Sequence, residues 1–149
     1  MSYTNAARGF QFVDTNVLVY AHDPTAGAKY ERARQLVSGL WEAREGCLSV
    51  QVLQEFYVTA TRRTARLLSP TDAAKVVSSL SFWRVHRPSA SHVLAAIDLS
   101  QQYCISFWDA MIIVSAARLR CSTLWTEDLN HGQTYDGVRV LNPFATPAA

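Results

Sequence analysis

Short apolar runs alternate along this chain with longer stretches in which apolar residues recur every three or four positions. The runs predict buried strands and the longer stretches predict helices with one apolar face. The expected strands are 10–13, 47–49, 83–86, 122–125 and 138–141. The expected helices are 16–21, 28–44, 50–63, one that begins at 69–72, 91–103 and 107–119.

Local signals support several of these helix boundaries. Ser49 is suited to cap the helix that starts at Val50, and Pro70 is suited to the first turn of the next one. The apolar face of helix 28–44 is formed by Ala33, Leu36, Val37, Leu40 and Trp41. The regular alternation of strands and helices predicts an α/β fold, in which a mostly parallel sheet lies between two layers of helices.

Four carboxylates stand beside the most apolar runs of the chain, namely Asp14, Glu55, Asp109 and Asp128. An ionised carboxylate next to a buried run is costly unless a cation is close to it. No lysine or arginine is placed equally near to these positions. Clustered carboxylates of this kind suit Mg²⁺ or Mn²⁺, so the sequence predicts a divalent metal site.

The predicted sheet brings these carboxylates to one place. Asp14 directly follows the first strand, and Asp128 lies three residues after Trp125. Asp109 falls in the first turn of its helix, and Glu55 falls one to two turns into another. Ligands of parallel α/β sheets bind outside the carboxyl ends of the strands, and all four side chains can reach that edge.

Each carboxylate also has a simpler structural explanation. Asp14 and Asp109 could stabilise helix starts, Asp128 could cap a turn, and Glu55 could be an ordinary surface residue. These explanations do not require all four to meet at one edge of one sheet. Polar neighbours could orient the carboxylates or bound water as an outer layer, and these are Thr15, Asn16 and Thr126. The histidines lack zinc-ligand spacing, and phosphate-binding glycine motifs and serine-hydrolase elbows are absent from the sequence.

Length and composition fit one globular domain over residues 1–149, with an ordered core at about 10–144 and short flexible ends. No apolar run reaches the ~20 residues of a membrane span, and the N-terminus lacks the apolar centre of a secretory signal. We therefore expect a cytoplasmic protein. The three cysteines are widely spaced and odd in number, so we expect reduced packing residues.

The charged residues point to an anionic partner. The net charge is only +2, but twelve of the fourteen cationic residues are arginine, which binds phosphate with two hydrogen bonds. Arg62, Arg63 and Arg66 lie within five residues and are possible RNA-binding groups. The alternative is a solvated helix end whose cations suit the helix dipole.

Four motifs together resemble the PIN domain family, and most of all the VapC-type toxins of bacterial toxin–antitoxin pairs. They are Phe12-Val-Asp-Thr-Asn-Val-Leu-Val-Tyr-Ala, Leu53-Gln-Glu-Phe, Trp108-Asp-Ala-Met-Ile and Leu124-Trp-Thr-Glu-Asp-Leu-Asn-His-Gly. The resemblance extends over about residues 10–144. It implies a PIN-like three-layer α/β/α sandwich and a metal-dependent endoribonuclease that hydrolyses phosphodiester bonds in cellular RNA.

The resemblance also implies roles for particular residues. Asp14, Glu55, Asp109 and Asp128 become the catalytic acids that hold Mg²⁺ or Mn²⁺, although Glu127 stands next to the fourth. The spacing of Thr126 favours Asp128 for that position. Three aromatic residues near the acids could stack on bases, but their apolar surroundings favour the core, and these are Phe107, Trp108 and Trp125.

Partners follow from the same resemblance. The implied partners are an RNA substrate, a small cognate antitoxin and a second copy of the chain in a homodimer. Aromatic residues in the helices between Ala28 and Arg66 make those helices candidate contact surfaces, with Leu40, Trp41, Phe56 and Tyr57. Three alternatives stay open: a PIN nuclease of RNA processing that is not a toxin, a non-catalytic module that binds nucleic acid or phosphate, and a phosphatase of the haloacid dehalogenase type. The last expects a second aspartate where Asn16 stands.

Overall fold

The computed structural model describes residues 9–146. The flexibility expected of the chain ends concerns residues that lie almost entirely outside this range. The strands are β1 (Gln11–Val13), β2 (Gly46–Ser49), β3 (Arg84–His86), β4 (Thr123–Trp125), β5 (Thr134–Tyr135) and β6 (Val138–Leu141). The α-helices are α1 (Thr15–Tyr20), α2 (Ala28–Ala43), α3 (Val50–Ala60), α4 (Pro70–Leu80), α5 (Ala90–Tyr103) and α6 (Phe107–Arg118), and two 3₁₀ turns are η2 (Pro24–Ala26) and η3 (Arg63–Ala65).

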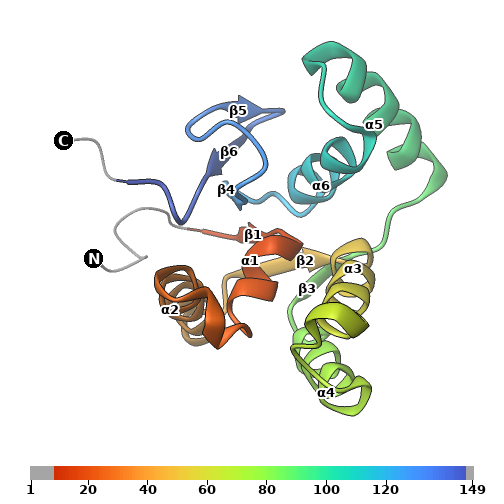
Figure 1. Ribbon diagram of the computed structural model, residues 1–149. Helices are drawn as coiled ribbons and strands as arrows, with labels where there is room; N and C mark the ends of the chain where they lie inside the picture. The colour runs from red at the N-terminus through yellow and green to blue at the C-terminus, as the bar shows by residue number, and fades with distance from the viewer. Residues whose placement is uncertain (1–8, 147–149) are drawn as a thin grey trace.

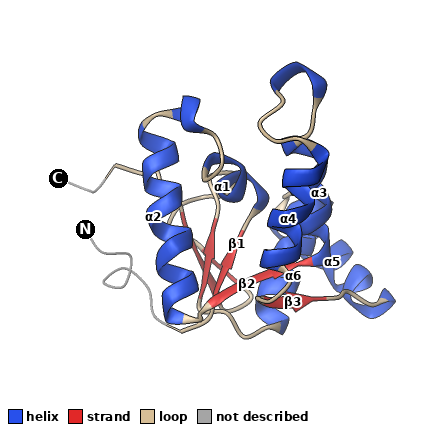
Figure 2. Cartoon of the chain, turned by 90° about the horizontal axis from the view of Figure 1, so that it is seen from below, coloured by secondary structure: helices blue, strands red, loops and turns tan. Residues whose placement is uncertain are grey.

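The strands form one sheet in the order β3-β2-β1-β4-β6-β5. All neighbours are parallel except β5 and β6, which are antiparallel. Helix α6 packs on the sheet with α5 outside it, and α2 lies on the opposite side (Figure 1). In the view from below, α1 and α3 stand at the end of the sheet where β1 and β2 finish (Figure 2). The predicted α/β fold with a mostly parallel sheet between helices is confirmed.

The sequence analysis did not predict strand β5. It forms a hairpin with β6, and the two residues that connect these strands are Asp136 and Gly137. Both have a positive φ, 49° and 81°. An Asp-Gly pair is the usual sequence signal for a turn that needs two positive φ angles, so this hairpin could have been found from the sequence.

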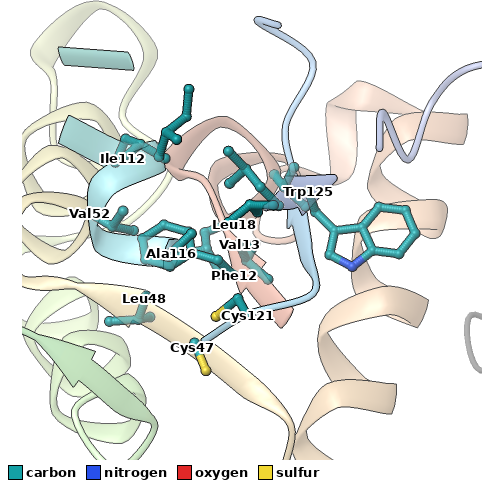
Figure 3. Packing of buried hydrophobic residues seen from close by; sticks show 14 of the residues in the cluster. Phe12, Val13, Leu18, Cys47, Leu48, Val52, Ile112, Ala116, Cys121 and Trp125 are labelled. Atoms are coloured by element: carbon teal, nitrogen blue, oxygen red, sulfur yellow. The ribbon is translucent and has the colours of Figure 1, made fainter. Parts of the chain in front are cut away.

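Helix α6 is buried over most of its surface, because the sheet covers one side of it and α5 covers another. Ile112 and Ala116 of this helix face the core together with Phe12 and Leu48 of the sheet (Figure 3). A helix that is apolar on nearly every face is expected in such a position. The packing fixes where α6 begins, and the first turn of α6 carries Asp109.

The cysteines differ from one another in their surroundings. Cys47 and Cys121 are buried in the core, as expected (Figure 3). Cys104 is exposed, so the expectation that it packs in the interior is wrong. It ends α5 in a left-handed conformation with a φ of 54°, beyond the last turn that contacts the core.

Two residues expected on a contact surface are instead part of the core. Leu40 and Phe56 have no exposed surface, because their helices turn these positions toward the sheet. Trp41 and Tyr57 are partly exposed, at 41% and 39%. The predicted helix 50–63 is also shorter than expected: it ends at Ala60, whose carbonyl accepts the amides of Leu67 and Leu68 at 3.1 Å each.

Within residues 9–146, no helix has both the length and the apolar character needed to cross a membrane.

Candidate functional site

A cavity of about 340 Å³ lies at the edge of the sheet where β1 ends and α1 begins. Side chains from the three helices α1, α3 and α6, from the residue between β1 and α1, and from the segment after β4 form its wall. They are Asp14, Thr15, Asn16, Val19, Tyr20, Gln51, Glu55, Thr59, Trp108, Asp109, Ile112 and Asp128. All four acids predicted from the sequence therefore meet in one cavity.

The register of the sheet places Asp14 next to Thr126. Val13 of β1 is paired with Trp125 of β4, so the residue after each strand leaves the sheet at the same level. The Asp14 amide donates to the Trp125 carbonyl at 3.0 Å, which continues the ladder by one bond. The Thr126 hydroxyl then donates to Asp14 Oδ2 at 2.9 Å. Two strands that are distant in sequence thus fix one buried carboxylate.

Asp14 also begins helix α1. Its Oδ1 accepts the amide of Thr15 at 2.7 Å, and its backbone is extended, as in a residue that precedes a helix. The capping explanation considered for Asp14 is therefore correct as a description of its geometry. It does not replace the proposed metal role, because a buried carboxylate held by one amide and one hydroxyl still has electron pairs to share.

Asn16 and Thr126 join Asp14 to Asp128. Asn16 Nδ2 donates to Asp128 Oδ2 at 3.0 Å and lies 3.3 Å from Thr126 Oγ1. The Asp128 amide donates to the same hydroxyl at 3.1 Å. The local turn around Asp128 is thus tied to β1 and α1 through Thr126, which is fully buried. Both residues thus contact the acids beside which the sequence analysis placed them.

Asp109 enters the cavity from helix α6. Ser106 caps this helix by accepting the Asp109 amide at 3.0 Å, so Asp109 lies in the first turn. One carboxylate oxygen from each of Asp14, Asp109 and Asp128 can be chosen so that the three lie within 4.8 Å of one another. This is close enough for one cation to contact all three acids.

Glu55 lines the same cavity from α3 and is not part of this group of three. Its Oε1 accepts the Thr15 hydroxyl at 3.1 Å and the Gln51 side-chain amide at 3.3 Å. Gln51, Glu55 and Thr59 are spaced four residues apart along α3, so they form one stripe of the cavity wall.

Glu127, the neighbour of Asp128, has a different environment. Its two carboxylate oxygens bind the Tyr20 hydroxyl and the Lys29 ammonium, at 2.9 Å in each case. Glu127 does not line the cavity. The geometry therefore assigns the cavity position to Asp128, as the Thr-x-Asp spacing suggested.

The electrostatics of the cavity favour a bound cation. The pKa of Asp14 is raised from 3.8 to about 7, mainly by burial. The hydrogen bonds from Thr15 and Thr126 lower this pKa, and the charges of Asp128 and Glu55 add to the rise. Burial also raises the pKa of Asp109, with a smaller contribution from Asp128. A cation among these groups would reverse both shifts, because it stabilises the ionised forms.

The donor atoms fit Mg²⁺ or Mn²⁺. The three clustered acids offer hard, anionic oxygens and no sulfur or imidazole, which is the set that these ions prefer. Asn16 Oδ1 is in addition a buried oxygen for which residues 9–146 provide no hydrogen-bond partner. The cavity thus holds clustered anionic oxygens and one unpartnered amide oxygen, and a bound cation would give these atoms a partner.

The histidines have other roles. His22 Nδ1 contacts the Leu18 carbonyl at 2.9 Å, and His131 Nδ1 accepts the Asn142 amide at 2.9 Å. His86 lies against Ser115 at 2.8 Å, and His92 caps α5. None of the four lines the cavity, in agreement with the absence of zinc-ligand spacing in the sequence.

The arginine cluster lies just beyond the helix that carries Glu55. Arg62, Arg63 and Arg66 are exposed on and beside η3, which follows α3. They do not line the cavity itself. They follow in sequence the helix that carries Gln51, Glu55 and Thr59.

Comparison with known proteins identifies the fold family. The model of the PIN domain family matches residues 12–136. The chain belongs to the PIN domain family. No curated protein sequence gives a significant match.

Several solved structures resemble this PIN domain. A toxin–antitoxin complex from Klebsiella pneumoniae is 22% identical, with a TM-score of 0.64, and covers 91% of this chain and 99% of that chain. The VapC20 toxin of Mycobacterium tuberculosis, described as cleaving the sarcin-ricin loop, is 20% identical, with a TM-score of 0.58 and coverage of 76% and 86%. FitAcB from Neisseria gonorrhoeae is 19% identical, with a TM-score of 0.58 and coverage of 92% and 100%. At these identities the likeness establishes the shared fold.

Several residues of the cavity wall were not among the predicted site residues, and these include Val19 and Ile112. Thr59 continues the four-residue spacing of Gln51 and Glu55 and could have been found from that spacing. Tyr20 ends α1, and nothing in its sequence context pointed to the cavity. Trp108 was expected in the core but is 63% exposed at the cavity. Of the other two aromatic residues considered, Trp125 is buried and Phe107 is half-buried, as expected.

Proposed function

We propose that this PIN domain is a metal-dependent endoribonuclease that hydrolyses phosphodiester bonds in cellular RNA. We propose further that it is the toxin of a type II toxin–antitoxin pair. One observation carries the enzymatic proposal. Three carboxylates from three separate segments, Asp14, Asp109 and Asp128, converge to within 4.8 Å in a cavity at the carboxyl ends of parallel strands.

This arrangement is difficult to explain without a cation. Asp14 is almost fully buried, and its charged form is opposed by both burial and two neighbouring acids. A fold that needed these carboxylates only as helix caps would not have to place them together. Asp14, Asp109 and Asp128 would hold Mg²⁺ or Mn²⁺, and Glu55 would act from α3 in the same cavity.

When bound, such an ion lowers the pKa of a water molecule and offsets the negative charge that grows on phosphate oxygens. The protein supplies the positioning. Thr126 and Asn16 hold two of the acids in place through their hydrogen bonds. Glu55 is held by Thr15 and Gln51 through Oε1 alone, which leaves Oε2 free to orient a water molecule or to accept its proton.

The role as a toxin rests on similarity. Structures that share this fold include a toxin–antitoxin complex from Klebsiella pneumoniae and a toxin described as cleaving the sarcin-ricin loop. By analogy, we propose a small antitoxin that binds this chain and a homodimer of the toxin. Trp41 and Tyr57 remain candidate contact residues on α2 and α3 because they are exposed, whereas Leu40 and Phe56 are not.

The enzymatic proposal is tested by incubating total cellular RNA with purified protein free of antitoxin. Parallel reactions contain Mg²⁺, Mn²⁺ or EDTA, and Asp14→Asn and Glu127→Gln serve as the inactive and the matched control variant. The nuclease proposal would be supported by discrete RNA fragments that form only with metal. Glu127→Gln should still produce these fragments, and Asp14→Asn should not. RNA that stays intact while folded protein binds it would instead support a non-catalytic binding module.

The toxin role needs a separate test in cells. Expression of the wild-type chain is expected to arrest growth, and expression of Asp14→Asn is not. Co-expression of a small neighbouring open reading frame with a DNA-binding N-terminal part is expected to restore growth. Cleavage in the test tube without growth arrest would favour a PIN nuclease of RNA processing.

A further inference from the structure

Trp108 is the most exposed of the four tryptophans. It is 63% exposed, compared with 41% for Trp41, 8% for Trp83 and 2% for Trp125. An indole ring has a large apolar surface, and exposing it to water is unfavourable. The position of Trp108 in the wall of the acidic cavity gives this exposure a reason, because a bound molecule can cover the ring there.

The backbone fixes Trp108 beside the acids. It directly precedes Asp109 in the first turn of α6, and Ile112 lies one turn later in the same cavity wall. The Phe107 ring packs edge-on against the indole, with centroids 5.1 Å apart. Gln51 Nε2 lies 3.5 Å from the Trp108 carbonyl oxygen, so α3 contacts the backbone at this point. The indole therefore stands one residue from a carboxylate that would hold the metal ion.

We propose that Trp108 stacks on an unpaired base next to the phosphodiester that is cleaved. The inference rests on the proposed function and specifies its substrate. In an RNA duplex each base is stacked on its neighbours, so it cannot lie on a side chain. Trp108 can therefore act only where the RNA is unpaired next to the cleaved bond. Stacking tolerates every base, so selectivity comes first from the shape of the RNA.

A nucleobase fits this position better than a protein side chain does. The surface that carries Trp108 continues into three clustered carboxylates, which suit a phosphate with its metal and repel an acidic peptide. The other aromatic residue of the cavity, Tyr20, is already occupied. Its hydroxyl binds Glu127, its ring packs edge-on with Phe144 at 5.1 Å, and the Lys29 ammonium lies 4.8 Å from the ring centre. Trp108 is thus the aromatic group of this cavity that can receive a base.

The first test compares variants on a single-stranded RNA that contains a mapped cleavage site. Trp108→Ala is expected to lower kcat/KM by about 5- to 100-fold, mainly through KM, because it removes one base-stacking contact. Trp108→Phe is expected to recover most of this loss. Phe82→Ala is the matched control, since Phe82 is also an exposed aromatic residue but lies outside the cavity, and it should cleave like the wild type. Thermal unfolding checks that Trp108→Ala folds normally.

An abasic nucleotide separates stacking from other effects. The base is removed on either side of the cleaved bond, one position at a time, and both enzymes are measured on each RNA. At one position, removing the base is expected to lower kcat/KM of the wild type by the same factor as the Trp108→Ala substitution does on normal RNA. The kcat/KM of Trp108→Ala should fall by no more than about 2-fold when the same base is removed. An equal loss by both enzymes at every position would overturn the stacking role.

Other outcomes are equally decisive. If Trp108→Ala cleaves like the wild type but binds the antitoxin more weakly, Trp108 is a protein contact and the inference is wrong. Equal cleavage of the same site in single-stranded and fully paired RNA would also overturn it. If the wild type cleaves no RNA at all, the proposed function fails and this inference fails with it.

Discussion

Glu127 and Asp128 are neighbours in the sequence, yet only Asp128 belongs to the acidic cavity. Glu127 forms a salt bridge with Lys29 at 2.9 Å, whereas Asp128 accepts a hydrogen bond from Asn16 at 3.0 Å. In the turn after β4, two neighbouring carboxylates thus lie in different surroundings. Substitutions at these two neighbouring positions are therefore expected to differ in their effect on activity.

Asp128→Asn is expected to lower kcat/KM for RNA cleavage by about 100-fold or more, because it removes one of the three clustered acids. Glu127→Gln is expected to keep nearly normal activity. Since the Lys29–Glu127 pair is partly exposed, its loss should lower the free energy of unfolding by no more than about 1 kcal/mol. Steady-state cleavage and urea unfolding check both variants. The reverse pattern of activities would show that the cavity assignment is wrong.

Thr126 offers a test of the outer layer. Its hydroxyl donates to Asp14 and accepts from Asn16 and from the Asp128 amide. Thr126→Ala leaves these groups without their shared partner, so we expect a loss of about 10- to 100-fold in activity or metal affinity. The free energy of unfolding should fall by roughly 1–3 kcal/mol.

Thr126→Ser keeps the hydroxyl and serves as the control. It is expected to recover most of the activity and of the metal affinity, measured by titration calorimetry with Mn²⁺. If alanine and serine were equally harmful, the methyl group of Thr126 and not its hydroxyl would be the important feature.

The raised pKa of Asp14 makes the stability of the metal-free protein depend on pH. Burial raises this pKa from 3.8 in a free carboxyl group to about 7 in the fold. At pH values below about 4 the group is protonated in both states and has no effect. Between about pH 4 and 7 only the unfolded chain ionises, so the stability due to Asp14 falls as the pH rises. Above pH 7 the folded protein carries the full cost of a buried charge.

Asp14→Asn is therefore expected to be more stable than the wild type in EDTA at pH 8, by up to about 4 kcal/mol, and the difference should shrink toward pH 4. Addition of Mg²⁺ or Mn²⁺ should stabilise the wild type and leave the variant nearly unchanged. Unfolding in urea at several pH values, with and without metal, measures both effects. A wild type that is the more stable form in EDTA at pH 8 would contradict the cost assigned to Asp14.

The parts of the site that follow from strand order could be predicted from the sequence. Asp14 and Asp128 each come directly or closely after a buried strand, and a parallel sheet places such positions at one edge. Glu55 follows from the helical spacing with Gln51. For these three residues, the local periodicity of the chain and the order of the strands determine where the side chain lies.

Other features depend on packing that a single sequence does not reveal. Trp108 and Ile112 belong to an almost uniformly apolar helix, so no periodicity distinguishes the exposed first turn from the buried body. Phe56 was placed on a surface because the covering contact comes from a remote segment, where the His22 ring packs edge-on at 5.3 Å. The hydrogen bond between Thr15 and Glu55 is likewise a contact that no spacing rule predicts.

The last prediction concerns the arginines beyond α3. Arg62 and Arg63 are exposed where a polyanion lying along Gln51, Glu55 and Thr59 would leave the cavity. Replacing both by glutamine should raise KM for RNA and leave kcat unchanged, because these groups are distant from the reacting atoms. Each lost phosphate contact should also flatten the dependence of log affinity on log salt by about 0.7.

The matched control is the double variant Arg118→Gln, Arg120→Gln. It removes two exposed arginines at the far end of α6, on the opposite end of the helix from Asp109. Binding to RNA at several salt concentrations, measured with the inactive Asp14→Asn background, separates a local contact from a general effect of net charge. Equal changes in both double variants would mean that only net charge matters, whereas a change confined to Arg62 and Arg63 would define the path of the RNA out of the cavity.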